Sequence, residues 1–249
     1  RWTQEKKKRL RESRVEGTRL LAETMSRMAN PPRALILASA VGIYGNRGDE
    51  VLNERSRPGT GFLAELCLEW ERAAEPARRA GIRVVHLRFG MVLSPRGGAL
   101  ARMLLPFRLG LGGPVGSGNQ YWSWISLEDA VGALLHLLGN DLSGAANAVS
   151  PLPATNAEFT RALGRVLSRP AFLPLPAFAA RAVFGEMAEG LLLCSARAVP
   201  ERLGESGFIF RDPDLGGALR RLLGPVGKDP LQQETEAGKG SRPESCRNS

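Results

Sequence analysis

The chain has 249 residues, of which 43% are hydrophobic, and this is typical of a soluble globular protein with one large domain or slightly more. No apolar run approaches the roughly 20 residues that a membrane-spanning helix needs, so we expect no membrane partner. The formal net charge is +9, but the basic residues are scattered and do not alternate with aromatic residues, which argues against a nucleic-acid partner.

The counts of histidine and cysteine argue against metal chemistry. There are two histidines, and the three cysteines, Cys67, Cys194 and Cys246, lie far apart in the sequence. An odd number of cysteines without short spacing fits neither a disulfide framework nor a zinc site. We therefore expect no metal cofactor and a reducing, intracellular compartment, cytoplasmic or mitochondrial, between which the sequence does not decide.

The first elements of the chain are typical of the second half of a nucleotide-binding sheet. Residues 1–28 form a helical segment with apolar residues on roughly one face, and the prolines at 31–32 end it. A continuous apolar run over 34–38 follows, as expected of a parallel strand that is covered on both faces. Because no strand with a glycine-rich turn precedes the first helix, we expect an N-terminally truncated sheet.

The next elements repeat this order. A second helix is predicted over residues 60–79, with Phe62, Leu66 and Trp70 on one face, and a second strand over 83–88. A repeated strand–helix–strand order implies right-handed crossovers between parallel strands. The expected fold class is therefore α/β, with a doubly wound parallel sheet followed by a smaller α/β C-terminal lobe.

The second half of the chain contains turn and capping signals. The glycine-rich segment 110–118 is interpreted as a turn, because its glycines miss the spacing of a dinucleotide-binding loop and no strand leads into it. Ser126 and Thr155 are predicted to begin helices, since each is followed three residues later by an acidic residue. A short strand is expected at 208–210 and a closing helix at 215–223.

These elements suggest three regions. Residues 1–118 are expected to form the remaining part of a nucleotide-binding domain, and residues 119–223 a C-terminal lobe that binds the substrate. Residues 224–249 are rich in Lys, Glu, Gln, Gly and Ser and are expected to form a disordered tail.

The ends of the two strands are the candidate ligand site. Open parallel sheets bind ligands beyond the carboxyl ends of their strands. Ser39, Gly42 and Gly45 follow the first strand, and Gly90 follows the second. Small residues allow the backbone to approach a ligand closely. We expect the two strand ends to lie side by side and to form half of a dinucleotide-binding cleft.

Several motifs around these strand ends resemble the extended branch of the short-chain dehydrogenase/reductase superfamily, which has a Rossmann-like fold. Residues 13–21 are similar to its helix with Asn-Val-x-Gly-Thr, and residues 39–45 to its strand that ends in Val-Tyr-Gly. Residues 87–95 and 124–129 are similar to two later motifs of the same branch. More narrowly, residues 105–113 and 155–159 and the long block 107–124 resemble an atypical subgroup of NAD(P)-dependent "epimerase family" proteins. Residues 185–187 and 213–223 are similar to the C-terminal domain of the same subgroup, a domain of unknown function.

The same comparison exposes a departure from the superfamily's catalytic pattern. The superfamily uses Tyr-x-x-x-Lys, in which the phenol is a general acid/base and the lysine lowers its pKa. Aligned on Glu71, Leu63 stands at the tyrosine position and Cys67 at the lysine position. Neither side chain can replace the expected one, so Ser39 and Tyr44 are the candidate catalytic groups. For Tyr44, packing beside the site is the competing interpretation.

The resemblance also implies the binding residues. NADP is the expected cofactor, with NAD as the alternative, because guanidinium groups on the first helix suit a phosphate. The residues implied to contact the cofactor are Arg9, Arg14, Ser39, Gly90, Met91 and Val92. The residues implied to contact the substrate are Gln120, Trp122 and Trp124, and the alternative for the tryptophans is a place in the core of the lobe.

Two functions remain open at this point. The first is an NADP-dependent oxidoreductase or epimerase that acts on an unidentified small molecule. The second is an NADP-sensing or non-catalytic interaction protein, which the missing tyrosine and lysine favour. A nucleic-acid-binding function rests on charge alone. We also expect a homodimer.

Overall fold

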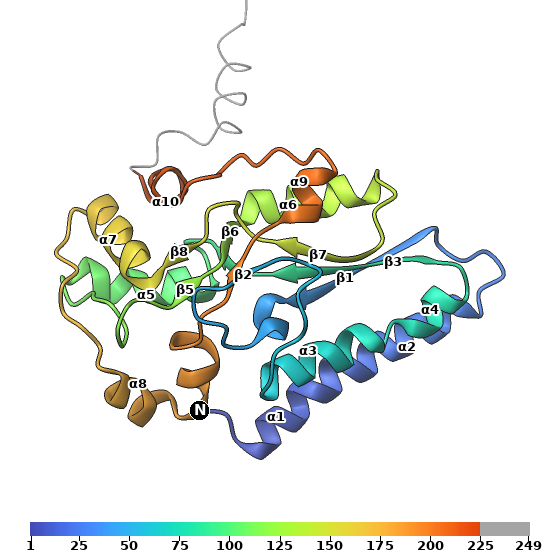
Figure 1. Cartoon of the computed structure of the whole chain (residues 1–249), viewed down its shortest axis with the longest axis horizontal. Helices are drawn as coiled ribbons and strands as arrows, with labels where there is room; N and C mark the ends of the chain where they lie inside the picture. Colours follow the sequence, from blue (N-terminus) through green and yellow to red (C-terminus); the bar gives the residue numbers. More distant parts are fainter. Residues whose placement is uncertain (225–249) are drawn as a thin grey trace, which may run out of the picture.

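A three-stranded parallel sheet lies at the centre of the fold, in the computed structural model that describes residues 1–224 (Figure 1). Its strands are β1 (Ala34–Ala40), β3 (Arg83–Phe89) and β7 (Gly144–Ala148), in the order β1-β3-β7. The first two strands are those predicted from the sequence. β7 was not predicted, because its sequence Gly-Ala-Ala-Asn-Ala lacks the β-branched and aromatic residues that mark a strand.

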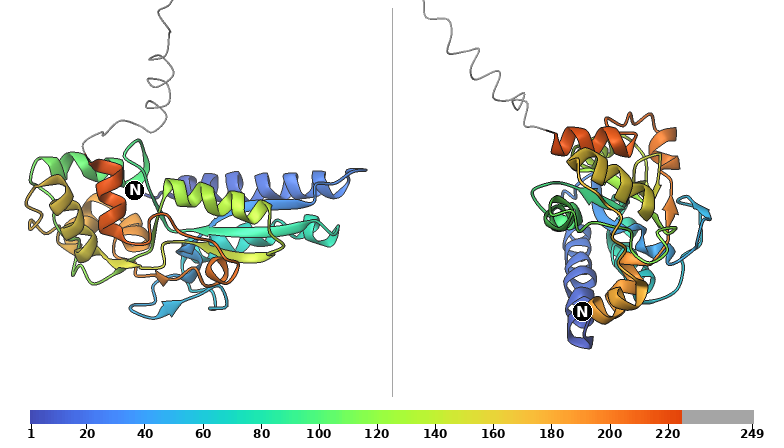
Figure 2. Two further views of the ribbon diagram at one scale, coloured as in Figure 1. Left: turned by 90° about the horizontal axis from the view of Figure 1, so that it is seen from above. Right: turned by 90° about the vertical axis from the view of Figure 1, so that its left-hand side faces the viewer.

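Helices cover both faces of this sheet, which confirms the doubly wound α/β fold (Figures 1 and 2). On one face lie α2 (Gly17–Ser26), α3 (Phe62–Arg72) and α4 (Glu75–Arg79), and on the other lies α6 (Leu127–Leu138). Alternate residues of the strands supply the two cores. Leu35 and Val84 pack with Ala22 and Ala77 on the first face, and Val85 and Leu87 pack with Ala133 and Leu137 on the second.

The first helical segment is divided into three parts rather than continuous over 1–28. It consists of α1 (Gln4–Arg11), a π-helical turn η1 (Glu12–Glu16) and α2. A π-helical turn inserts an extra residue into the helical repeat and is frequent at functional sites. Here it contains Arg14, one of the residues implied to bind the cofactor.

The predicted second helix is likewise divided. α3 ends at Arg72, and α4 begins at Glu75 with Pro76 in its first turn. Proline is tolerated in the first turn of a helix but not in its interior, so Pro76 explains why one continuous helix does not form.

The remaining strands form three small ladders beside the sheet. β4 (Met91–Leu93) pairs in parallel with β6 (Trp124–Ser126), and β2 (Val51–Leu52) with β9 (Arg197–Ala198). β5 (Tyr121–Trp122) pairs antiparallel with β8 (Ala154–Thr155). The other helices are α5 (Gly98–Arg108), α7 (Asn156–Leu167), α8 (Ala177–Phe184), η3 (Ala188–Leu192), α9 (Glu201–Glu205) and α10 (Leu215–Leu223).

The capping signals identify two helix starts correctly. The Ser126 side chain accepts a hydrogen bond from the Asp129 amide at the start of α6. At the start of α7, Thr155 and Glu158 form a reciprocal capping box. Each cap satisfies backbone donors that the first turn of a helix leaves free.

In the C-terminal region, two predicted features have different outcomes. The strand expected at 208–210 is wrong, because these residues are not in a strand and Phe208 instead stacks against His136 and Phe210. The tail predicted to begin at 224 lies outside the described residues from residue 225 onward. Within residues 1–224, no helix is both long and apolar enough to cross a membrane.

Candidate functional site

Three polar side chains form a row at the carboxyl end of the central sheet. Ser39 on β1 is in register with Arg88 on β3, and Arg88 is in register with Asn147 on β7. All three residues are buried. The adjacent pairing of β1 and β3 confirms that the strand ends carrying Ser39 and Gly90 lie side by side.

An ion pair between Glu71 and Arg88 lies at the centre of this row. Arg88 donates from Nε to Oε1 of Glu71 at 2.8 Å and from Nη2 to Oε2 at 2.9 Å. The Ser39 hydroxyl donates to the same carboxylate at 2.7 Å. The side chains of Arg88 and Glu71 are only 9% and 11% exposed. The pair therefore joins α3 to β3 in a two-pronged, nearly dry contact.

Tyr44 extends the network to the third strand. It ends a short 3₁₀ helix, η2 (Val41–Tyr44), that follows β1, and its side chain is fully buried. Its hydroxyl accepts a hydrogen bond from Nη1 of Arg88 at 3.0 Å and donates to Oδ1 of Asn147 at 2.7 Å. Asn147 in turn donates from Nδ2 to the carbonyl of Val199 and from its backbone amide to Glu54.

The environment fixes the charge states of these groups. Burial would raise the pKa of Glu71, but hydrogen bonds from Arg88, the charge of Arg88 and the Ser39 hydroxyl together lower it. Burial would lower the pKa of Arg88, but its bonds to Glu71 and Tyr44 raise it overall. Burial raises the pKa of Tyr44. At neutral pH the network is therefore a neutral phenol beside an ionised pair with no net charge.

The two candidate catalytic hydroxyls are thus brought into one network without touching each other. Ser39 reaches it through Glu71, and Tyr44 reaches it through Arg88. Both hydroxyls already have hydrogen-bond partners, and neither residue has substantial exposed surface. The structure favours a packing and positioning place for Tyr44, and proton transfer by either hydroxyl stays a prediction.

Cys67 lies in the same region but lacks the properties of a reactive thiol. Burial, followed by the negative charge of Glu71, raises its pKa to about 11. A thiol with such a pKa is almost entirely protonated at neutral pH and is a poor nucleophile. Cys67 therefore fills the lysine position of the superfamily pattern as a small core residue.

The two arginines implied to bind the cofactor have different surroundings. Arg14 is half-buried, and its guanidinium lies 5.3 Å from the centre of the Trp70 ring on α3. Arg9 is exposed and pairs with Glu5 at 2.9 Å, one turn earlier on the same helix. Among residues 1–224, Arg14 has no carboxylate partner within 4.0 Å. Of the two, only Arg14 has a fixed position with unused donors.

The residues that follow β3 contact the backbone of β6. Gly90 is pressed against Ser123, so a Cβ atom at Gly90 would lie 2.5 Å from the Ser123 carbonyl oxygen. Met91 donates its amide to the same carbonyl at 2.8 Å, and Met91 and Val92 pair with Trp124 and Ile125. The absence of a side chain at Gly90 is therefore explained by packing between two strands, and contact of these three residues with a cofactor stays a prediction.

We expect Gly90→Ala to lower the free energy of unfolding by about 1–3 kcal/mol, because the backbone at Ser123 has to move aside. Gly17→Ala is the matched control, because a Cβ atom at this position meets nothing within 4 Å. Replacing a glycine in a helix by alanine should not lower the stability. Urea unfolding followed by circular dichroism measures both. Equal stabilities of the two variants would contradict this explanation of Gly90.

The three residues implied to bind the substrate are buried in the C-terminal lobe. Gln120 donates from Nε2 to the carbonyls of Val115 and Leu192, each at 2.9 Å. Trp122 and Trp124 donate their indole N–H groups to backbone carbonyls, and Trp124 has no exposed surface. This favours the core interpretation for both tryptophans, and substrate contact stays a prediction.

The sequence reasoning did not single out four members of the network: Glu54, Glu71, Arg88 and Asn147. Charged residues on a strand or apolar helix face, such as Arg88 and Glu71, were the available signal, because a buried charge needs a partner. Glu54 lies in the loop after β2, and its Oε2 is buried without a hydrogen-bond partner among the described residues. Burial raises the pKa of Glu54.

Comparisons with known proteins place this site in a family. The profile described as "NAD dependent epimerase/dehydratase family" matches residues 1–149, and a domain of unknown function, DUF1731, matches residues 175–222. An epimerase family protein of Mycobacterium tuberculosis is 49% identical over 220 residues, which cover 88% of this chain and 72% of the relative. The human epimerase family protein SDR39U1 is 40% identical, with 90% and 76% covered.

A solved structure agrees with these sequence matches. The crystal structure of human epimerase family protein SDR39U1 (isoform2) with NADPH superposes with a TM-score of 0.85 at 39% identity. The superposition covers 89% of this chain and 76% of the human one. The chain therefore belongs to the NAD dependent epimerase/dehydratase family, with the Rossmann-like fold of the atypical short-chain dehydrogenase/reductases.

Proposed function

We propose that the chain binds NADP(H) beyond the carboxyl ends of β1 and β3 and acts as an NADP-dependent oxidoreductase or epimerase on a small molecule. The row of Ser39, Arg88 and Asn147 at three adjacent strand ends carries this proposal, because open parallel sheets bind their ligands there. The NADPH in the human relative's structure supports NADP over NAD. Once bound, the nicotinamide would supply the site that accepts or donates a hydride.

The residues present fit a phosphorylated dinucleotide. Arg14 offers a half-buried guanidinium whose orientation is fixed by Trp70 and by the π-helical turn. Guanidinium groups bind phosphate oxygens through two parallel hydrogen bonds. The Glu71–Arg88 pair has no net charge, and Ser39 at the end of β1 would lie near a nicotinamide bound beyond the strand ends.

We expect Arg14→Ala to weaken NADPH binding about tenfold or more, since a charge-assisted hydrogen bond to phosphate is lost. Arg9→Ala is the control on the same helix and should change affinity less than about twofold, because Arg9 is exposed and paired with Glu5. Titration followed by NADPH fluorescence measures both variants. Equal losses of NADPH affinity in the two variants would contradict the assignment of Arg14 as a phosphate-binding residue.

A second candidate function is an NADP-responsive protein without turnover. The observation that favours it is the engagement of both candidate hydroxyls, with Tyr44 fully buried and Leu63 and Cys67 in place of the superfamily's tyrosine and lysine. In this case NADP would act by stabilising one arrangement of the chain for a partner.

Turnover separates the two functions. The wild-type chain is incubated with NADPH and a panel of carbonyl compounds, and NADPH oxidation is followed by absorbance. Because an epimerase returns the hydride and consumes no cofactor, hydroxy compounds are also incubated with NADP and the formation of their epimers is measured. For an enzyme that uses Ser39 as a proton-transfer group, we expect Ser39→Ala to lower the rate at saturating NADPH by about 10²–10⁴-fold. Tyr44→Phe is tested beside it. Tight NADPH binding with no turnover of any compound supports the second function.

A further inference from the structure

One end of the molecule combines positive charge with exposed apolar side chains. The segments 91–127 and 159–185 together contain seven arginines and no lysine, aspartate or glutamate, although the chain has 25 acidic residues. Helix α5, residues 159–167 of α7 and helix α8 lie within these segments, and the three helices lie together at the left-hand end of the view in Figure 1. This distribution concentrates part of the net charge of +9 at this end of the molecule.

Backbone contacts tie the two segments together at this end. Leu173 donates its amide to the carbonyl of Gly112 at 3.1 Å, and Leu175 donates to Pro114 at 2.9 Å. A Cβ atom at Gly113 would lie within bonding distance of the Leu173 carbonyl, so only glycine allows this approach. The loop between α7 and α8 is therefore fixed against the segment that follows α5.

This fixed arrangement leaves large apolar side chains exposed. Phe172 is 77% exposed, and Leu105 on α5 and Leu109 directly after its last residue are 67% and 65% exposed. Leu111 and Leu173, on the two tied segments, are also exposed. Single exposed leucines are ordinary, but a group on neighbouring segments marks an interaction surface. We call these five residues the apolar end.

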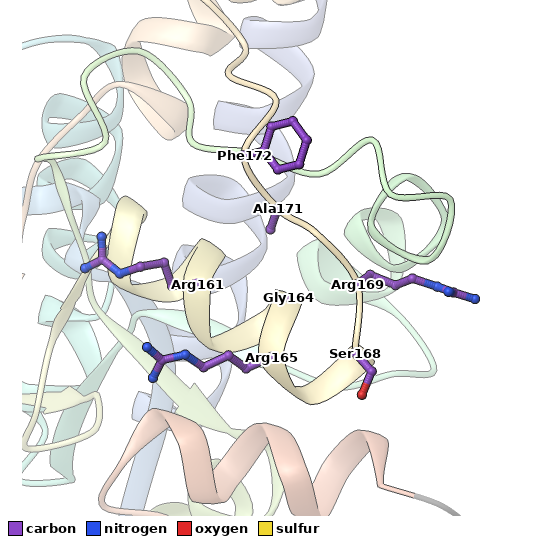
Figure 3. A pocket seen from close by; sticks show the side chains of 7 residues that line it. All are labelled: Arg161, Gly164, Arg165, Ser168, Arg169, Ala171 and Phe172. Carbon is purple, nitrogen blue, oxygen red and sulfur yellow. The ribbon is translucent and has the colours of Figure 1, made fainter.

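Arginines surround a hollow beside the apolar end. The hollow has a volume of about 380 Å3 and is bordered by Arg161, Arg165, Arg169 and Phe172 (Figure 3). Arg161 and Arg165 lie on α7 and Arg169 lies on the segment that follows it, and in this view its side chain points to the opposite side from theirs. Among residues 1–224, none of these three arginines makes an ion pair with a carboxylate within 4.0 Å. Their donors are free to bind an external anion.

We propose that this end of the molecule docks on the surface of an anionic lipid membrane. The phosphate groups of lipids suit the arginines at the hollow, and the acyl region suits the apolar end. Surface attachment of this kind needs no spanning helix, and each basic residue near an anionic surface strengthens it. This proposal is independent of the NADP site.

The composition of the surface selects this partner over two others. A second copy of the chain would bring the same unpaired arginines face to face, which is repulsive. A nucleic acid would be bound by aromatic side chains that stack on bases, but four of the five residues of the apolar end are leucines.

The test is flotation of the full chain with lipid vesicles. One set contains phosphatidylcholine alone, and the other contains equal parts of phosphatidylcholine and phosphatidylglycerol. We expect binding to the anionic vesicles only. The double variant Arg165→Gln/Arg169→Gln should bind about tenfold more weakly. Phe172→Ser/Leu173→Ser should also reduce binding, because it removes the apolar contact.

The matched control is Arg19→Gln/Arg27→Gln, which removes the same charge from α2 and its C-terminus, away from the lobe. The control should bind as the wild type does. Failure to float with anionic vesicles, or equal losses in the control and in the Arg165/Arg169 variant, would overturn the proposal. So would tighter binding to single-stranded RNA that depends on the same two arginines.

Discussion

Glu71→Gln is expected to lower the free energy of unfolding by about 3–5 kcal/mol, the largest effect of any single substitution considered. The variant keeps the shape of the side chain but leaves the buried Arg88 charge without a counter-charge. Chemical denaturation at neutral pH measures the loss. Glu75→Gln is the matched control, because Glu75 pairs with Arg78 and Arg79 at the surface, where solvent screens the ion pair and its loss should cost far less.

The pH dependence of this difference provides a second readout. The folded-state pKa of Glu71 is lowered, so its contribution is complete above the unfolded-state pKa, near 4.5, and is lost as the pH falls through the folded-state value. The stability gap between wild type and Glu71→Gln should therefore be constant around neutrality and shrink in acid. A gap that persists in strong acid would show that the carboxylate charge is not its source.

The second large effect is an increase in NADPH affinity when a strand with a glycine-rich turn is added before Arg1. Within residues 1–224, β1 has a strand partner on one side only. We expect a version extended by a strand and a Gly-x-x-Gly-x-x-Gly turn to bind NADPH about 100-fold more tightly, because glycine-rich turns supply backbone amides to the pyrophosphate. At saturating NADPH this corresponds to about 2.7 kcal/mol of added stability.

The exposed face of α6 supplies a control for this experiment. The exposed side chains on this face of α6 are Leu127, Val131, Leu134, Leu135 and Leu138. In the extended version, a helix that follows the added strand can cover them. Thermal unfolding with and without NADPH is measured on both versions, together with binding of a dye that reports exposed apolar surface. Similar NADPH shifts in the two versions would show that the added segment is not needed for cofactor binding.

Much of the central fold was predictable from local patterns. The continuous apolar runs of β1 and β3 identify buried parallel strands, and the boxes at Ser126 and Thr155 identify helix starts. β7 escaped prediction because its burial comes from its place beside β3 rather than from its own alanines. The π-helical turn at Arg14 was missed because a long amphipathic pattern does not reveal a small change of helical repeat. The break before α4 was missed although Pro76 is a sequence signal for it.

The candidate site was predictable in position but not in content. The rule for parallel sheets located the strand ends at Ser39 and Gly90 correctly. The hydrogen-bond partners of Ser39 and Tyr44 are residues 71, 88 and 147, which lie on other elements of the fold. A pattern within one segment of the sequence does not predict such contacts. Gly90 illustrates the same limit, since its neighbour Ser123 is far along the chain.

The shared use of Arg88 by two partners has a consequence for how this protein can diverge. A change at Glu71, Tyr44 or Arg88 alone strands a polar group in the interior, so each first step is costly whichever residue moves first. Because the cost of changing one of these three residues depends on the other two, Glu71, Tyr44 and Arg88 should evolve together. Homologous sequences should either retain all three residues or replace them together. Single substitutions at these positions will therefore be tolerated less well than joint replacement of the three.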